Sequence, residues 1–515
     1  CVGFPLCSCA PSSCDNDIDG ILWCTSNNVS ISNAHSDDGG FETQVYNNTV
    51  CWTPNLLELS RRALVFDKAY TVVSSCSPSR ASLLSGLPPH QNGMYGLHQG
   101  VHGFQSFAEV QALPQVLSEH GVRTGIIGKK HVGPESVYPF DFAHTEENSS
   151  ILQVGRNITR IKQLVRMFLH SNDSRPFFLY VAFHDPHRCG HTHPQYGQFC
   201  EKFGNGKPGM GCIPDWEPQL YDPSDVIVPY FVPDTPAARQ DISAQYTTVG
   251  RLDQGVGLVL LELARAGFQD NTLVIYSSDN GIPFPNGRTN LYEPGTREPF
   301  IIADPTRPQS FNKRSNAMVS LLDIMPTVLD WFGIPLPTYK IFRKGVIFTG
   351  ASLLPLLDAG SMAKPRDTIY GSHSLHEITM YYPMRSVCNH RFKLVHNLNF
   401  LMPFPIDQDF YLSPTFQDIL NRTQEGVPIP WSKNLTSYYY RSNWELFDLQ
   451  EDPNELHNLA WNVSYVEIFG ELKHSLSKWQ DLTRDPWVCA PGSVWEASGR
   501  FKAHPQCLPL HNNVG

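Results

Sequence analysis

The sequence contains no long hydrophobic run and no surplus of positive charge. No stretch approaches the roughly 20 consecutive apolar residues of a membrane-spanning helix, so we expect no membrane span. Acidic residues outnumber basic ones, 49 against 39, and the basic residues form no stripe. Nucleic-acid binding therefore has no electrostatic support. Internal repeats and low-complexity tracts are also missing, and the 41% apolar content is that of a folded globular protein.

The 515 residues exceed the size at which one hydrophobic core keeps growing, so the length predicts two domains. Short apolar runs typical of buried parallel strands alternate with stretches in which apolar residues recur at helical spacing. This alternation predicts an α/β domain. The strand runs lie at 124–128, 177–183 and 272–277, and the helical stretches at 161–170 and 249–266.

The composition changes after about residue 360, where a second, smaller α+β domain is predicted. Its elements are a hairpin at 384–397, a strand at 445–448 and a helix near 465–482. We therefore divide the chain into an atypical N-terminal segment, a catalytic domain and a C-terminal domain. Their bounds are 1–35, 36–378 and 379–515.

The asparagine and cysteine residues indicate the secretory pathway. Thirteen cysteines fit an oxidising compartment, and their odd number leaves at least one unpaired or used for chemistry. No signal peptide is recognisable, so we expect residues 1–35 to be processed or misassembled. Eight N-x-S/T sequons favour a glycoprotein. They begin at Asn28, Asn47, Asn148, Asn157, Asn172, Asn421, Asn434 and Asn462.

Histidine is the residue type that makes the charge of this chain sensitive to acid. Protonation of all 20 histidines would change the net charge from −10 to +10. An acidic compartment would therefore remove the repulsion between the protein and a polyanionic substrate.

Polar side chains follow each predicted strand of the first domain. Lys129 and His131 follow the first, the residues 184–187 follow the second, and Asp279 and Asn280 follow the third. In open α/β sheets, ligands bind beyond the carboxyl ends of the strands. We therefore expect these residues to share one site.

Cys76 lies in the run Cys76-Ser-Pro-Ser-Arg80, directly before a predicted short helix over 79–86. Pro78 is harmless near a helix start, and the cysteine would face the positive end of the helix dipole. On these grounds alone, a buried structural residue, a disulfide partner and a thiolate nucleophile all stay open.

Two acidic pairs complete the candidate residues. Asp37-Asp38 and Asp279-Asn280 are each followed by glycine and would each, alone, be typical of a turn. Together they offer the hard oxygen ligands that Ca²⁺ takes. The stretch 28–36 before the first pair is only weakly alternating, and we expect it to be too polar for a central buried strand.

Two long motifs of the chain resemble the signatures of the sulfatase family. The first is Cys76-x-Pro78-Ser79-Arg80-x-x-x-Leu84-x-Gly86, and the second runs from Gly121 to His131. The resemblance implies an alkaline-phosphatase-like large mixed sheet flanked by helices, with a smaller C-terminal antiparallel sheet. It also implies that Cys76 is oxidised to formylglycine before folding.

The resemblance assigns roles residue by residue. It implies one Ca²⁺ per subunit, held by Asp37, Asp38, Asp279 and Asn280. Of the two histidines in His184-Asp-Pro-His187, the second matches the Pro-His element of the family. The implied catalytic residues are Cys76, Arg80, Lys129, His131, His187 and Arg288.

Long segments within 36–515 are similar to sulfatases that act on N-sulfated glucosamine. This implies lysosomal removal of N-linked sulfate from the non-reducing end of heparan sulfate, by a homodimer that a formylglycine-generating enzyme has modified. It also implies the disulfides Cys189–Cys200 and Cys489–Cys507.

The implied mechanism begins when one hydroxyl of hydrated formylglycine attacks the sulfur. His187 protonates the leaving amine, and His131 then takes a proton from the second hydroxyl to release sulfate. An acidic activity optimum follows from this assignment.

Three alternatives stay open. They are an O-sulfatase, a phosphomonoesterase or phosphodiesterase on the related fold, and a non-catalytic glycan-binding protein.

Overall fold

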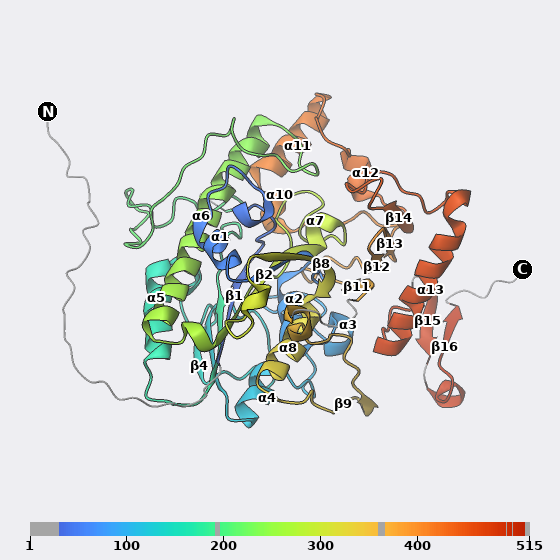
Figure 1. Cartoon of the computed structure of the whole chain (residues 1–515). Helices are drawn as coiled ribbons and strands as arrows, with labels where there is room; N and C mark the ends of the chain where they lie inside the picture. The colour runs from blue at the N-terminus through green and yellow to red at the C-terminus, as the bar shows by residue number, and fades with distance from the viewer. Residues whose placement is uncertain (1–29, 191–195, 359–365, 491, 497, 510–515) are drawn as a thin grey trace, which may run out of the picture.

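The computed structural model describes residues 30–190, 196–358, 366–490, 492–496 and 498–509 (Figure 1). The N-terminal segment predicted over 1–35 lies, up to residue 29, outside the described residues. No helix in the described ranges combines the length and the apolar character that crossing a bilayer requires.

A mixed sheet of eight strands forms the centre of the molecule, in the order β4-β3-β5-β1-β6-β7-β2-β8. The five strands from β4 to β6 are parallel, β7 runs antiparallel to both of its neighbours, and β8 is parallel to β2. The three strands predicted from apolar runs are β3, β5 and β6, buried along their whole length. The bounds are β1 Ser30–Ser36, β2 Leu64–Tyr70, β3 Arg123–Gly128, β4 Phe142–Thr145, β5 Phe177–Ala182, β6 Thr272–Ser278, β7 Arg297–Ala303 and β8 Lys313–Ser320.

Helices cover both faces of this sheet and build a separate apolar core on each (Figure 1). The predicted helices at 161–170 and 249–266 are confirmed, although the second begins earlier, at Pro236. Helices of one face are α1 Pro54–Ser60, α5 Ile158–Leu169 and α6 Pro236–Arg265. Helices of the other face are α2 Cys76–Ser85, α4 Leu113–Glu119 and α8 Ile324–Trp331.

A second sheet of four antiparallel strands lies toward the C-terminus, in the order β11-β12-β13-β14. The predicted hairpin, strand and helix are confirmed as β12 with β13, as β14 and as α13, which packs against this sheet. The sheet begins at β11, ahead of residue 379, and the division of the chain there stays a prediction. The bounds are β11 Thr368–His373, β12 Met384–Asn389, β13 Phe392–Asn397, β14 Trp444–Asp448 and α13 Val466–Thr483.

The expectation that 28–36 is too polar for a central strand is wrong for its described part. Strand β1, Ser30–Ser36, lies between β5 and β6, pairs in register with both, and is buried throughout. Main-chain hydrogen bonds to two neighbours hold a strand in place whatever side chains it carries. The side chains of Asn33 and His35 are buried with no hydrogen-bond partner among the described residues, which costs stability. Because β1 is central, Asp37 follows it at the same sheet edge as the other predicted residues.

A buried histidine joins the first part of the chain to the second sheet and to α13. His90, in helix α3 Pro89–Asn92, contacts Ser372 Oγ through Nδ1 at 2.7 Å and Thr483 Oγ1 through Nε2 at 2.8 Å. Burial lowers the pKa of His90 to about 4, while the neighbouring Asp485 raises it and Arg385 lowers it. The folded protein therefore keeps this ring neutral where an unfolded chain would protonate it.

We expect His90 to make the stability of the protein fall in acid. Between about pH 6.5 and pH 4 the unfolded state binds a proton that the folded state does not, so stability decreases as the pH falls. Urea unfolding at about pH 7 and about pH 4.5 should show a smaller acid-induced loss in His90→Asn, by roughly 2 kcal/mol. The exposed His457→Asn is the control and should follow the wild type. An equal acid-induced loss in all three proteins would refute this role for His90.

Candidate active site

The carboxyl ends of four neighbouring strands bring the predicted residues into one buried site. Asp37 and Asp38 follow β1, Lys129 follows β3, and Asp279 and Asn280 follow β6. The histidines at 184 and 187 follow β5. All lie on adjacent strands of the parallel part of the sheet, which is why residues far apart in the sequence meet there.

Cys76 is the first residue of α2 and is only 1% exposed. The helix ends at Gly86, whose φ of +67° is a left-handed conformation that glycine adopts without strain. In the described chain Cys76 is a free cysteine, so it is not a disulfide partner. Burial raises the pKa of its thiol, and so do the nearby carboxylates, whereas Lys129 lowers it. The thiolate form is therefore disfavoured, which weakens the thiolate-nucleophile alternative.

Acidic and basic groups surround the Cys76 sulfur on several sides. Sγ lies within 4.8 Å of carboxylate oxygens of Asp37 and Asp279, and within 4.8 Å of Asp38 and of a ring nitrogen of His187. A group attached at this position would therefore meet both the carboxylates and the histidine.

Two buried cations hold the acidic residues of the site. Arg80 donates from Nε to Asp279 Oδ2 at 2.9 Å and from Nη2 to Asp37 Oδ1 at 3.2 Å. Lys129 Nζ donates to the other oxygen of Asp37. Burial alone would raise the pKa of Asp37, but the charge of Lys129, together with that of Arg80, holds it well below its usual range. Asp37 is therefore ionised.

The chemical groups of the four predicted metal ligands suit the binding of a cation. Burial raises the pKa of Asp38 well above its usual range and that of Asp279 to about 7, and the nearby carboxylates add to both shifts. Asn280 donates from Nδ2 to Asp38 Oδ1 at 2.7 Å, yet its own Oδ1 is buried without a hydrogen-bond partner among the described residues. An orphaned carbonyl oxygen beside crowded carboxylates is the oxygen-rich surrounding that Ca²⁺ takes.

His131 and Arg288 complete the predicted set. Both ring nitrogens of His131 are buried and lack a hydrogen-bond partner in the described ranges, so the ring is available to a bound molecule. Arg288 donates from Nη1 to Asp38 Oδ2 at 2.6 Å, and its Nη2 donates to Asp407 and Asp409. These two aspartates come from the C-terminal part of the chain and were not predicted.

The structure gives the two histidines after β5 different surroundings. His184 Nδ1 lies 2.7 Å from Glu146 Oε1 and is thereby engaged. His187 donates from Nδ1 to the Arg188 carbonyl at 2.8 Å, which directs Nε2 toward Arg288 Nη1 at 3.0 Å. Burial and the charge of Lys129 lower the pKa of His187, so its protonated form prevails only in acid.

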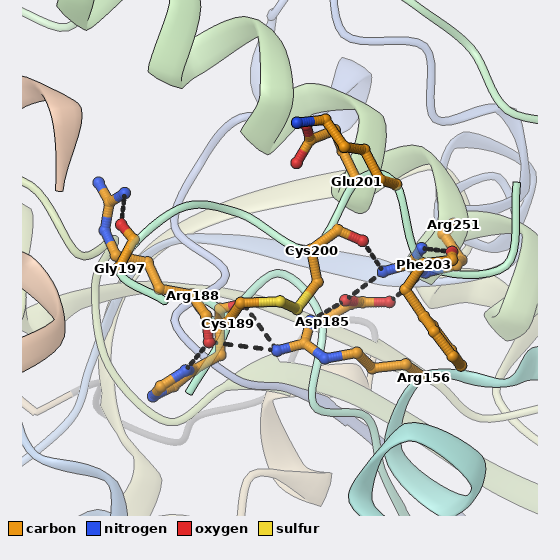
Figure 2. Close-up of a disulfide and its surroundings, with 11 residues drawn as sticks. Arg156, Asp185, Arg188, Cys189, Gly197, Cys200, Glu201, Phe203 and Arg251 are labelled. Atoms are coloured by element: carbon orange, nitrogen blue, oxygen red, sulfur yellow. Dashed lines mark hydrogen bonds and ion pairs between the residues drawn. A yellow bond between two sulfur atoms is a disulfide. The ribbon is translucent and has the colours of Figure 1, made fainter. Parts of the chain in front are cut away.

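A buried ion triad anchors the turn that carries His187, and Figure 2 shows its members Arg156, Asp185 and Arg251 beside the disulfide. Asp185 accepts from Arg251 Nε at 2.7 Å and from Arg251 Nη2 at 3.0 Å, and also from Arg156 Nη1. Arg156 Nη2 in turn donates to the His187 carbonyl at 2.9 Å. The predicted disulfide Cys189–Cys200 is confirmed and closes the adjoining loop. The ring of His187 is therefore oriented by a buried ion triad.

The disulfide between Cys489 and Cys507, the second predicted pair, is also confirmed. It joins the segment after α13 to the last strand, β16 Gln506–Pro509.

We expect Asp185→Asn to destabilise the protein strongly. The substitution leaves two arginines, each fully buried, without their shared counter-charge, and breaking a buried ion pair costs about 3–5 kcal/mol. The midpoint of urea unfolding measures this loss. Asp173→Asn removes an exposed partner of Arg175 and should cost no more than about 1 kcal/mol. Equal midpoints for the two variants would contradict the anchoring role.

Comparison with known proteins extends over most of the chain. A sequence profile of the sulfatase family matches residues 34–334. The chain is 65% identical to human N-sulphoglucosamine sulphohydrolase, over 93% of this chain and 94% of that protein. It is 23% identical to an N-acetylglucosamine-6-O-sulfatase of Bacteroides thetaiotaomicron, over 85% of this chain and 84% of that protein. A protein solved in complex with its substrate D-glucosamine-2-N,6-O-disulfate matches with a TM-score of 0.61 and 20% identity, covering 89% of this chain and 98% of that one.

The matched profile includes all ten predicted site residues, from Asp37 to Arg288. The likeness in fold agrees with the observed large mixed sheet flanked by helices and the smaller antiparallel sheet, so the predicted fold class is confirmed. Sequence, fold and the placement of Cys76 at a helix start thus lead to one conclusion: the chain belongs to the sulfatase family.

Proposed function

We propose that this protein removes N-linked sulfate from glucosamine residues at the non-reducing end of heparan sulfate. The observation that supports it most is the position of Cys76, whose sulfur lies within 4.8 Å of three carboxylates and of His187. The name of the human relative, at 65% identity, supports the choice of N-sulfated glucosamine. Heparan sulfate as the source of that sugar is part of the proposal.

Cys76 becomes formylglycine in this proposal, through a formylglycine-generating enzyme. Hydrated formylglycine supplies a hydroxyl as the nucleophile, where the buried thiol would be mostly protonated. The start of α2 adds the positive end of a helix dipole at the same point, which favours an anionic substrate group.

One Ca²⁺ per subunit belongs to the same proposal, held by Asp37, Asp38, Asp279 and Asn280. When bound, the cation supplies positive charge that polarises the sulfate. The raised pKa of Asp279 and the orphaned oxygen of Asn280 support a cation there.

The remaining residues act on the sulfate and on protons. Lys129 and Arg288 bind sulfate oxygens through charge-assisted hydrogen bonds, and Arg80 stabilises negative charge at the nucleophile. A hydroxyl oxygen of hydrated formylglycine forms a bond to sulfur as the S–N bond breaks, and the electron pair of the broken bond goes to nitrogen. Protonated His187 then gives nitrogen a proton from Nε2. His131 accepts the proton of the second hydroxyl, the carbon–oxygen bond to sulfate breaks, and the aldehyde forms again as sulfate leaves. The lowered pKa of His187 supports an activity optimum in acid.

We place the protein in the lysosome, as a homodimer with a catalytic domain at 36–378 and a C-terminal domain at 379–515. Eight sequons and two disulfides support passage through the secretory pathway. The need for a protonated His187, whose pKa is lowered, supports an acidic destination.

The test compares two substrates on the same purified protein, under the same acidic conditions. N-sulfated glucosamine should be hydrolysed with a kcat/KM at least about tenfold above that of 6-O-sulfated N-acetylglucosamine, because discrimination between substrates is a ratio of these constants. Preference for the 6-O-sulfated sugar would replace the proposal by an O-sulfatase. Release of sulfate from neither would favour a non-catalytic glycan-binding protein.

A further inference from the structure

We propose that Asp409 is the residue that selects an amine leaving group, by binding the ammonium that forms when the S–N bond breaks. The inference rests on the proposed function and deepens it, since it assigns substrate specificity to one side chain at the same site.

Asp409 belongs to a short helix that the C-terminal part of the chain brings to the site. This helix, α10 Gln408–Tyr411, begins after Asp407. Asp409 Oδ1 accepts from Arg288 Nη2, and Asp409 Oδ2 lies 3.7 Å from His187 Nε2. The same His187 ring reaches within 4.8 Å of Cys76 Sγ. Asp409 therefore lies beside the ring that would protonate the leaving group.

The charge of Asp409 needs an explanation at this place. A carboxylate beside an anion-binding site repels sulfate and opposes substrate binding. Nη2 of Arg288 meets both Asp407 and Asp409, so the pair of carboxylates exceeds the charge of that one guanidinium. A cationic part of the substrate or product would balance the two carboxylates.

Asp407 already has structural roles that Asp409 lacks. Its side chain caps α10 by accepting from the Phe410 main-chain nitrogen, and it is 4% exposed. The side chain of Asp409 is 12% exposed, and its Oδ2 is directed at His187. Asp409 is thus the carboxylate of the pair that a ligand can reach.

The chemistry of the leaving group supplies that cation. Cleavage of the S–N bond leaves the electron pair on nitrogen, which takes one proton from His187. The resulting amine takes a second from the acidic solvent and becomes an ammonium ion. Cleavage of an O-sulfate ends at a neutral hydroxyl. A carboxylate therefore forms a charge-assisted hydrogen bond to the amine product only.

The first test uses the unaltered, full-length enzyme and two matched sugar inhibitors, one cationic and one neutral. Methyl glucosaminide carries the ammonium in acid, and methyl glucoside has a hydroxyl at the same carbon. We expect the glucosaminide to inhibit at a concentration at least about tenfold lower, as a charge-assisted contact gives. Equal inhibition by the two sugars would overturn the proposal, since a carboxylate that binds only sugar hydroxyls would not separate them.

The second test compares Asp409→Asn with the wild type. The variant should weaken inhibition by methyl glucosaminide at least about tenfold, while inhibition by inorganic sulfate changes less than about threefold. Sulfate reports whether the anion site is intact. Asp418→Asn, which removes the partner of Arg422 on α11 Pro414–Glu425, is the matched control and should change neither. Equal weakening of both inhibitors by Asp409→Asn would make it a structural residue and overturn the proposal.

Failure of the role of Asp409 can be told apart from failure of the proposed function. If the wild type hydrolyses N-sulfated glucosamine but does not prefer the glucosaminide, only the role of Asp409 is rejected. If the wild type prefers 6-O-sulfated sugar, the N-sulfate function itself is rejected. Should Asp409→Asn fail to fold, equal inhibition of the wild type by the two sugars would still overturn the proposal.

Discussion

Replacing Cys76 by alanine should remove sulfate release almost completely, with a fall in kcat on the order of 10⁴-fold or more, as loss of a nucleophile does in covalent catalysis. The substitution deletes a sulfur that lies within 4.8 Å of His187 and of the carboxylates of Asp37, Asp38 and Asp279. Arg80, Lys129 and their partners stay in place, so binding of sulfate should persist while turnover is lost.

The measurement combines kinetics with mass spectrometry of the peptide that contains residue 76. In active protein we expect the mass of the aldehyde or of its hydrate in place of the thiol. Cys388→Ala is the matched control, because Cys388 is also free and buried but packs in another cluster, beside Tyr70 and Met318. It should keep its turnover within about threefold. Full activity of a protein whose residue 76 is entirely thiol would reject formylglycine as the nucleophile.

The central sheet was predictable only where the side chains report burial. Strands β3 and β5 are covered on both faces, so they appear in the sequence as short apolar runs. Strand β1 is equally central, but it carries Asn33 and His35, and only the pairing of its main chain with two neighbours identifies it. A strand whose position depends on its partners cannot be recognised from its own residues.

The residues of the active site were likewise predictable only in part. Cys76 and Lys129 were predicted because each lies within a compact motif. Asp185 stands between His184 and the predicted His187, but its partners are 29 and 66 residues away and are brought to it only by folding. Asp409 is 121 residues from Arg288, and no spacing rule connects the two. Sequence motifs therefore indicate the chemistry, and tertiary structure adds the groups that orient it.

Removing the proposed cation should lower the activity more than any other change except the loss of Cys76. Burial and mutual repulsion raise the pKa values of Asp38 and Asp279, which means that the site favours a proton, or another cation, over two bare carboxylates. Chelation should lower kcat/KM on the order of 10³-fold, because the sulfate then loses the charge that polarises it. Added Ca²⁺ should restore activity, and equimolar Mg²⁺ should restore less, since Mg²⁺ demands a more rigid octahedral site.

Thermal unfolding separates the cation from catalysis, because a ligand that binds only the folded state stabilises it whether or not turnover occurs. Saturation to 100 times the dissociation constant should stabilise the wild type by about 2.7 kcal/mol. Asp279→Asn removes one carboxylate ligand and should need a much higher Ca²⁺ concentration for the same shift. Asp173→Asn, whose carboxylate pairs with Arg175 at the surface, should titrate like the wild type. Identical Ca²⁺ titrations for Asp279→Asn and the wild type would exclude Asp279 as a ligand. Neutralising a buried carboxylate that contacts the cation must weaken Ca²⁺ binding.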